Sequence, residues 1–225
     1  MPTAITPIRL ALPYRLGSVN CYLITAAAGC LLIDTGASNR RAELVQALAS
    51  AGCRPGDLTL IVLTHGDFDH TGNAVHLRRK YGAKIAMHGG DAGMLERGDM
   101  FWNRQKGSAF LRRIAPVLFG FGRSQRGSPD VILADGCDLA AYGCDARVLH
   151  LPGHSAGSIG ILTSAGDLFC GDLLDNTRQP ALNSIMDDVP TAQASVERLR
   201  GLAIGTVYPG HGQPFQWEQF IKPQG

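Results

Sequence analysis

The sequence predicts an α/β protein in which two sheets pack back to back and helices cover their outer faces. Short apolar runs with strand character recur in both halves of the chain, and each half also contains a stretch with helical periodicity. Polar and titratable residues stand where several of these strands end. The 28 glycines among 225 residues indicate many tight turns between short elements. These features are typical of a layered fold with a polar site at one edge of its sheets.

The composition fits one well-packed domain. Hydrophobic residues make up 45% of the chain and charged residues 18%, so we predict a single domain over residues 1–225. The net charge of +2 is too small to indicate a nucleic-acid partner. The amino terminus has no charged start followed by a sustained apolar core, and no run reaches the roughly 18 apolar residues of a membrane-spanning helix. We therefore expect a cytoplasmic protein without stable membrane insertion.

The six cysteines show no C-x-x-C spacing, and most of them stand in apolar sequence such as GCLLID and LFCGD. An even cysteine count would suggest disulfides in a secreted protein, but no export signal is evident. We predict reduced thiols in the core at Cys21, Cys30, Cys53, Cys137, Cys144 and Cys170.

The predicted elements repeat from one half of the chain to the other. In the first half, strands are expected over residues 5–12, 18–25, 30–33, 60–63 and 83–87, the second and third forming a hairpin. Helices are expected from Ser38 or Asn39 to Ser50 and over residues 74–80. In the second half, strands are expected over residues 138–141, 146–151, 158–163, 168–170 and 206–208, with a helix from Pro190 to Leu202.

One loop carries an unusual density of titratable groups. The buried strand at 60–63 runs into Thr64-His65-Gly66-Asp67-Phe68-Asp69-His70, two imidazoles and two carboxylates at the end of a core strand. Because neighbouring loop residues point in different directions, His65 and Asp67 could face one metal ion while Asp69 and His70 face a second. The alternative is a polar loop whose aspartates cap the next helix and whose histidines bond the backbone.

Four other polar residues near strand ends have two interpretations each. Asp34, which ends a strand, is either a turn residue or a carboxylate that orients a metal ligand. His88 could line the site, although a structural histidine with satisfied hydrogen bonds is the preferred interpretation. Ser155 lacks a separate base, so capping of a helix or turn is favoured over nucleophilic catalysis. Tyr208 could donate a hydrogen bond to a substrate, but core packing is favoured.

Residues 97–127 differ in character from the rest. Aromatic and aliphatic residues are interleaved there with basic ones, and no acidic residue of this segment follows Asp99. After Arg97 the basic residues are Arg104, Lys106, Arg112, Arg113, Arg123 and Arg126. We predict an inserted, partly helical flap that is apolar on one side and basic on the other. Three roles are open for it: a lid over the site, a homodimer contact, or a membrane-surface helix.

Five motifs, in order along almost the whole chain, carry a family resemblance. They are IDTG at 33–36, THGDFDHTGN at 64–73, LPGHSAGSIG at 151–160, CGD at 170–172 and PGHG at 209–212. In this pattern the chain resembles the metallo-β-lactamase superfamily, including its glyoxalase II and lactonase members. The resemblance implies a four-layer αββα sandwich with two metal ions in the cleft between the sheets.

The resemblance also implies a set of metal ligands. The first ion would be held by His65, Asp67 and His154, the second by Asp69, His70 and His211, and Asp172 would bridge them. One position departs from the family's commonest loop, His-x-His-x-Asp-His, because Asp67 replaces its second histidine. A carboxylate there adds negative charge and favours iron or manganese relative to an all-nitrogen site. Its shorter side chain also predicts a weaker first site.

The implied activity is hydrolysis of an ester-like bond in a thioester, lactone or related small acyl compound by a metal-bound hydroxide. The expected cofactors are two divalent ions, zinc first and iron or manganese because of Asp67, and Asp69 is the expected catalytic residue that orients the nucleophile. Expected partners are a small-molecule substrate, no nucleic acid, and a second copy through residues 97–127. A diiron oxidoreductase related to flavodiiron proteins and a non-catalytic metal-binding protein are the alternatives.

Overall fold

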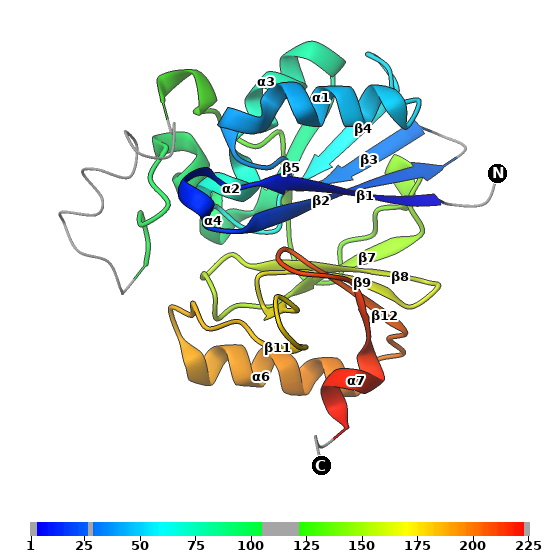
Figure 1. The fold of residues 1–225 in the computed structure, drawn as a ribbon, viewed down its shortest axis with the longest axis vertical. Coiled ribbons are helices and arrows are strands. Elements are labelled where there is room, and N and C mark those ends of the chain that lie inside the picture. The colour runs from blue at the N-terminus through cyan, green and yellow to red at the C-terminus, as the bar shows by residue number, and fades with distance from the viewer. Residues whose placement is uncertain (1–3, 27–28, 105–121, 223–225) are drawn as a thin grey trace.

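The computed structural model describes residues 4–26, 29–104 and 122–222, and these residues form four layers in the order helix, sheet, sheet, helix (Figure 1). Helices α1 (Arg41–Ser50) and α3 (Ala74–Tyr81) cover the outer face of the first sheet. Helices α6 (Val189–Arg200) and α7 (Trp217–Ile221) cover the outer face of the second. The predicted αββα sandwich is confirmed.

The first sheet has six strands in the order β1-β2-β3-β4-β5-β6. Their bounds are β1 Ala4–Ala11, β2 Ser18–Ala26, β3 Gly29–Ile33, β4 Leu58–Val62, β5 Lys84–His88 and β6 Val131–Leu133. The first three strands pair antiparallel, and β3 to β6 pair parallel. Parallel pairing brings the carboxyl ends of β3, β4 and β5 to one edge of the sheet, where the titratable loop follows β4.

The second sheet has five strands in the order β13-β12-β9-β8-β7. Their bounds are β7 Ala146–His150, β8 Ile159–Thr163, β9 Asp167–Gly171, β12 Thr206–Pro209 and β13 Phe215–Gln216. Only β9 and β12 pair parallel, so both deliver the residues that follow them to the same edge. Two short strands, β10 (Leu174–Asp175) and β11 (Ala181–Leu182), form a separate pair beside this sheet. The remaining α-helices are α2 (Phe68–Thr71) and α4 (Gly89–Arg97).

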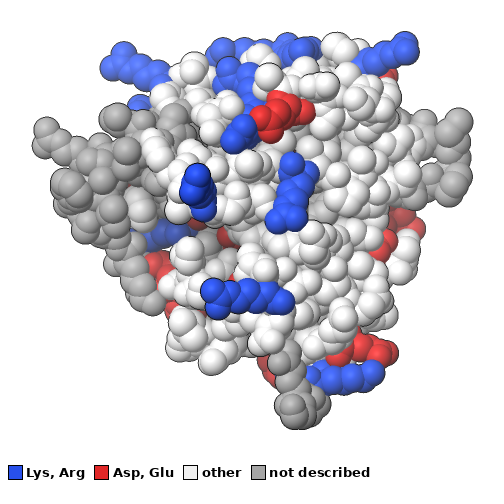
Figure 2. Space-filling view, in the orientation of Figure 1, with Lys and Arg blue, Asp and Glu red and all other residues white. Residues whose placement is uncertain are grey.

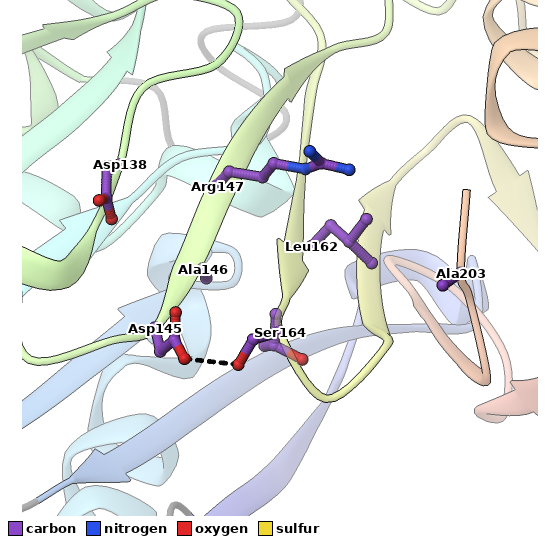
Figure 3. Close-up of a pocket in the computed structure, with 8 residues that line it drawn as sticks. Asp138, Asp145, Ala146, Arg147, Leu162, Ser164 and Ala203 are labelled. Atoms are coloured by element: carbon purple, nitrogen blue, oxygen red, sulfur yellow. Dashed lines mark hydrogen bonds between the residues drawn. The ribbon is translucent and has the colours of Figure 1, made fainter. Parts of the chain in front are cut away.

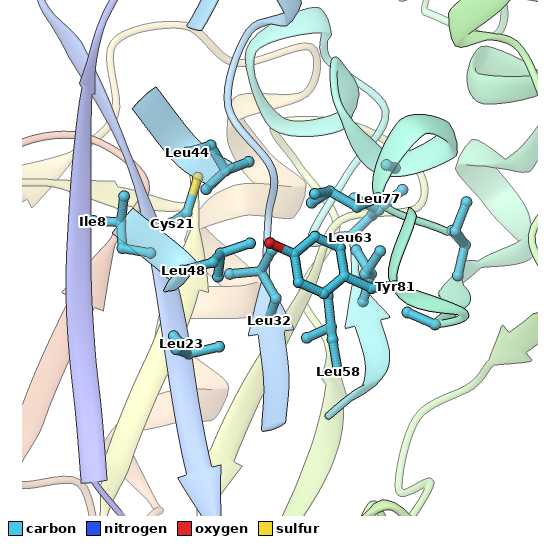
Figure 4. Packing of buried hydrophobic residues seen from close by; sticks show 14 of the residues in the cluster. Ile8, Cys21, Leu23, Leu32, Leu44, Leu48, Leu58, Leu63, Leu77 and Tyr81 are labelled. Atoms are coloured by element: carbon cyan, nitrogen blue, oxygen red, sulfur yellow. The ribbon is translucent and has the colours of Figure 1, made fainter. Parts of the chain in front are cut away.

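Alternation along the strands divides the core into layers. In β3, Leu31 and Ile33 pack between the two sheets, whereas Leu32 faces the helices outside the first sheet. Figure 4 shows this outer layer, in which Leu44 of α1 and Tyr81 of α3 pack against the sheet. A third cluster lies between the second sheet and α6 and α7. Each sheet is thus buried on both faces, which explains the nearly continuous apolar sequence of β3 and β4.

One predicted strand is wrong, and four short strands were missed. Residues 138–141 make only a single bridge, from Asp138 to Arg147, and then enter a 3-10 turn at Ala140–Tyr142. The Asp138 carboxylate accepts a hydrogen bond from the Ala140 amide at 2.8 Å, which turns the chain away from the sheet. The missed strands are β6, β10, β11 and β13, each of which has only two or three residues, too few to show a period. The other predicted strands and helices are confirmed to within a few residues.

Most of the predicted flap, residues 105–121, lies outside the described residues. On its amino-terminal side α4 ends at Arg97 and a turn continues to Arg104, and on the other side Arg123–Gln125 form a 3-10 turn. Among the residues described, no helix combines the length and apolar character that crossing a membrane requires. Figure 2 shows that many Lys and Arg side chains on the visible face lie at the top, over the outer helical layer of the first sheet.

Candidate metal centre

The structure brings all seven predicted ligands to one edge of the sandwich, between the two sheets. The first sheet contributes the loop after β4 and helix α2, which carry His65, Asp67, Asp69 and His70. The second sheet contributes His154 after β7, Asp172 after β9 and His211 after β12. Six of the seven are buried, and His211 is partly exposed.

Two of the histidines are oriented by backbone carbonyls. Nδ1 of His154 donates to the Ile185 carbonyl at 2.7 Å, and Nδ1 of His211 donates to the Ser18 carbonyl at 2.8 Å. Because a carbonyl oxygen only accepts, the proton of each neutral ring lies on Nδ1. The lone pair of Nε2 is therefore directed at the cluster in both rings.

Asp34 orients the other two histidines. Its Oδ2 accepts a hydrogen bond from Nδ1 of His70 at 2.8 Å and another from the Thr64 hydroxyl at 2.8 Å. Since that hydroxyl has given its only proton to Asp34, it accepts from Nδ1 of His65 at 2.9 Å. Asp34 has a φ of +59°, a left-handed conformation that aspartate tolerates better than most residues. The sequence left Asp34 as either a turn residue or a carboxylate that orients a metal ligand, and these contacts fit the second interpretation.

One group of potential ligand atoms comprises Asp69, His70 and His211, whose ligand atoms all lie within 4.8 Å of one another. Nε2 of His211 lies 3.5 Å from Asp69 Oδ2 and 3.2 Å from Asp172 Oδ2. Nε2 of His70 lies 3.4 Å from Asp172 Oδ1. Ligands bound tetrahedrally at about 2.1 Å stand about 3.4 Å apart, so these separations are those of a metal site.

The neighbouring group comprises His65, His154 and Asp172, again within 4.8 Å. Asp67 lies beside this group, with Oδ2 at 3.1 Å from Nε2 of His154 and 3.7 Å from Nε2 of His65. Asp67 occupies the N-cap position of α2, yet its side chain makes no capping hydrogen bond. The helix-capping alternative therefore does not describe Asp67, whose carboxylate is directed into the cluster.

Arg104 is a functional candidate that sequence reasoning missed. Its Nη2 donates to Asp67 Oδ1 at 2.6 Å and lies 3.2 Å from Nε2 of His154. Burial alone would raise the pKa of the Asp67 carboxyl, but the guanidinium beside it lowers that pKa well below its usual range. Arg104 is one of seven basic residues in residues 97–127, and no signal in the sequence distinguishes it from the others.

Mutual electrostatic effects in the cluster are strong because it is buried. Burial would lower the pKa of His70, but Asp34 and Asp172 overcome that effect and raise it. Burial likewise would raise the pKa of Asp172, but the nearby imidazoles His211 and His70 lower it well below its usual range. Asp172 is therefore held as a carboxylate, the form that binds a cation.

Asp91 ties two of the ligand-bearing loops together and was also missed. It is fully buried at the start of α4, and its carboxylate accepts from the Gly66 amide at 2.9 Å and the Gly157 amide at 2.7 Å. The Ser155 hydroxyl donates to it as well, at 2.6 Å. Ser155 thus has a structural bond inside a turn, in line with the non-nucleophilic interpretation. The sequence signal for Asp91 is HGGD directly after a strand.

Tyr208 and His88, for which the sequence left two interpretations each, lie away from the cluster. The Tyr208 ring stacks on Phe169 at 4.9 Å between the sheets, which is core packing and not contact with the pocket. His88 stacks on His150 at 4.2 Å, and its Nδ1 accepts a hydrogen bond from the Gly90 amide at 3.1 Å.

All six cysteines are free thiols, and burial raises the pKa of Cys170, two residues before Asp172, to about 12. Cys170 is therefore a neutral thiol and no nucleophile.

A pocket of about 410 Å³ opens onto the cluster. Ligand residues form its polar floor, and six apolar side chains form its walls: Leu12, Leu16, Phe68, Met100, Phe101 and Ile185. A second pocket, of about 340 Å³, lies at the opposite end of β7 and β8, where Asp145 accepts a hydrogen bond from Ser164 at 2.6 Å (Figure 3). No histidine is among the residues that line it. The first pocket is thus the candidate substrate site.

The cluster fits a metal ion by its donor atoms. Nε2 of His65, Nε2 of His70 and Oδ1 of Asp172 are buried and have no hydrogen-bond partner among the described residues. Buried polar atoms are almost always satisfied, so three such atoms in one cluster indicate a missing partner that accepts their lone pairs. Imidazole nitrogens and carboxylate oxygens together suit zinc, iron and manganese.

Comparisons with known proteins agree with this site. The family model described as the metallo-beta-lactamase superfamily matches residues 14–211. The acyl-coenzyme A thioesterase MBLAC2 of Bos taurus is 31% identical, over 90% of this chain and 76% of that protein. The hydroxyacylglutathione hydrolase of Anaeromyxobacter dehalogenans is 31% identical, over 68% and 45%. The crystal structure of TTHA1623 in a di-iron-bound form is 26% identical, with a TM-score of 0.73 and coverage of 97% and 98%.

The fold, the buried cluster of imidazoles and carboxylates and these similarities together define a metal-dependent hydrolase. The chain belongs to the metallo-beta-lactamase superfamily. The family resemblance seen in the five sequence motifs is confirmed.

Proposed function

We propose that the protein hydrolyses an ester-like bond of a small acyl compound, with a thioester as the first candidate. The observation that carries the proposal is the pocket, whose apolar walls suit an acyl chain and whose floor is the cluster of potential metal ligands. Two relatives are named for acylated thiol carriers, an acyl-coenzyme A thioesterase and a hydroxyacylglutathione hydrolase. Those names favour a thioester over a lactone.

The proposed ligands fall into two adjoining sites. His65, Asp67 and His154 form the first site, Asp69, His70 and His211 form the second, and Asp172 lies between them. A bound divalent ion lowers the pKa of water to about 7 and polarises the acyl carbonyl. Zinc is the first candidate ion, and the di-iron-bound form of TTHA1623 makes iron the second.

Asp69 is the proposed catalytic carboxylate. It lies at the pocket floor, where one oxygen faces His211 and the other can accept a proton from the attacking water. Burial raises the pKa of Asp69, which brings this carboxylate closer to the basicity that a general base needs. Attack forms a carbon–oxygen bond, the carbon–sulfur bond breaks, and the thiolate takes up the proton, so that a carboxylic acid and a thiol leave.

A substrate panel tests the proposal. The protein, loaded with zinc or manganese, is assayed against acyl-coenzyme A and acylglutathione thioesters by thiol release, and against lactones by acid release. We expect thioester turnover with kcat/KM at least about tenfold above that for lactones, a difference of about 1.4 kcal/mol in transition-state stabilisation. Metal bound in full with no turnover of any ester would contradict the proposal.

Replacing Asp34 with asparagine is expected to weaken metal binding about 10- to 100-fold while leaving the fold intact. Asparagine tolerates the left-handed backbone, but it cannot accept from both Nδ1 of His70 and the Thr64 hydroxyl with the strength of a carboxylate. Isothermal titration with zinc measures the change. Asp57→Asn, an exposed aspartate that accepts from the Arg54 amide, is the matched control and should titrate like the unchanged protein.

Diiron redox chemistry is the second candidate, favoured by the carboxylate at position 67 and by the di-iron-bound relative. Elemental analysis of protein purified without added metal separates the two. About two equivalents of iron, with oxygen consumption when a reductant is supplied, would favour the redox function. Zinc or manganese with ester turnover would favour the hydrolase.

A further inference from the structure

We propose that Arg104 competes with the metal ion for the first site, so that the second site binds its ion more tightly than the first. This inference rests on the ligand assignment of the proposed function. It concerns which cation balances Asp67: a divalent ion or the guanidinium of the chain itself.

The first observation is the position of the guanidinium. Nη2 of Arg104 lies 2.6 Å from Asp67 Oδ1 and 3.2 Å from Nε2 of His154, so one nitrogen directs both of its hydrogens at two proposed ligands. A guanidinium only donates. A metal ion at about 2.1 Å from Nε2 would use the lone pair that Nη2 contacts. Occupancy by the ion and the contact with Arg104 therefore exclude each other.

The second observation is burial. The side chains of Arg104 and Asp67 are only 7% and 9% exposed, so water screens their pairing little. The guanidinium stays protonated at any pH that the protein tolerates. It therefore presents a permanent positive charge beside the first site, which repels a divalent ion there and offsets the extra negative charge that Asp67 brings.

The third observation is that an anchored turn delivers Arg104. The turn between α4 and Arg104 is held by Asp99, whose carboxylate accepts from the Phe101 amide at 2.9 Å. The Asn103 amide donates to the Gly90 carbonyl, and the Arg97 guanidinium lies over the Trp102 ring at 3.6 Å from its centroid. The backbone of Arg104 is thus fixed relative to α4, and its head group can leave the cluster only by a change of side-chain rotamer.

Among the described residues, no positively charged Lys or Arg side chain pairs with the ligands proposed for the second site. Asp69, His70 and His211 contact one another and Asp172, and no described lysine or arginine forms an ion pair with any of them. Its four ligand residues include two carboxylates and two oriented imidazoles. The structure therefore favours an asymmetric centre that fills at the second site first.

The test is metal stoichiometry, which does not depend on turnover. The unchanged protein and Arg104→Ala are stripped of metal with a chelator and titrated with zinc by calorimetry, with equilibrium dialysis and elemental analysis as a second readout. We expect one tight equivalent in the unchanged protein and a second that binds at least about tenfold more weakly. In Arg104→Ala the weaker equivalent should tighten at least about tenfold, while the tight one stays the same.

Two further variants make the comparison specific. Arg123→Ala removes the same charge from an exposed side chain in a nearby turn and should titrate like the unchanged protein. Arg104→Gln keeps most of the side-chain length without the charge and should behave like Arg104→Ala, which covers the case in which the alanine variant does not fold.

The outcomes distinguish this inference from the proposed function. Two equivalents of equal affinity in the unchanged protein, or an unchanged weaker site in both Arg104 variants, would overturn the competition while leaving a metal-dependent hydrolase in place. Failure of the unchanged protein and of both variants to bind zinc, manganese or iron would overturn the ligand assignment and with it both proposals.

Discussion

Replacing Asp172 with alanine is expected to lower ester hydrolysis at least about 10³-fold, which corresponds to about 4 kcal/mol of transition-state stabilisation. Asp172 contributes ligand atoms near both groups: Oδ2 lies 3.2 Å from Nε2 of His211 in the second group and 4.0 Å from Nε2 of His154 in the first. Without it, each proposed site loses a charged ligand. We expect less than half of the metal bound by the unchanged protein, measured by elemental analysis.

The matched control for Asp172→Ala is Asp145→Ala. Asp145 directly precedes β7 at the opposite end of the second sheet, where its carboxylate accepts a hydrogen bond from the Ser164 hydroxyl in the second pocket (Figure 3). This variant should keep full metal content and full activity. Circular dichroism establishes that both variants are folded. An Asp172→Ala protein with undiminished kcat/KM would contradict a catalytic centre that includes this carboxylate.

Replacing Asp91 with alanine is expected to have the largest effect on stability, a loss of about 3 kcal/mol or more in the free energy of unfolding. The change leaves two buried donors without an acceptor, the Gly66 and Gly157 amides, and the Ser155 hydroxyl keeps only its bond with the Ser158 hydroxyl. Each unsatisfied buried donor costs about 1–3 kcal/mol, and relief of the buried charge offsets part of the sum. Urea unfolding followed by fluorescence measures the difference.

Asp91→Asn keeps the shape and one acceptor oxygen, so its loss should be about half that of the alanine variant. Because Asp91 bonds the residues next to His65 and His154, we also expect both variants to bind metal more weakly than the unchanged protein. Asp57→Ala, an exposed aspartate, is the stability control. A difference below about 0.5 kcal/mol between Asp91→Ala and the unchanged protein would show that water replaces the lost carboxylate.

The sequence predicted the layers and the convergence of the motifs because both depend on local patterns. Short apolar runs defined strands such as β2 and β8, and the polar residues that ended the strands were expected at one edge of the sheets. The loop from His65 to His70 was recognisable since its titratable residues are adjacent in the chain. The predictions were wrong or incomplete where the pattern was short, as in β6 and at Asp138.

The residues that sequence reasoning missed act across long separations. Asp91 bonds Gly66 and Gly157, which lie 25 and 66 positions away in the chain, and Arg104 reaches Asp67 across 37 positions. No period or motif links such pairs, because their meeting depends on how whole elements pack. Asp34 occupies an intermediate case: its place in IDTG suggested an orienting role, but its contacts with His70 and Thr64 required the fold.

The distribution of the proposed ligands over the two sheets links metal binding to folding. An ion bound at the proposed second site would join the loop that carries His70 to the loops that carry Asp172 and His211, and so would cross-link the two halves of the chain. A ligand that binds only the folded state adds stability in proportion to the logarithm of its free concentration, about 2.7 kcal/mol at 100 times its Kd. With metal in excess, the two halves of the sandwich would unfold together. Removal of the ion would weaken the contact between the two sheets before it affected the packing of the outer helices on either sheet.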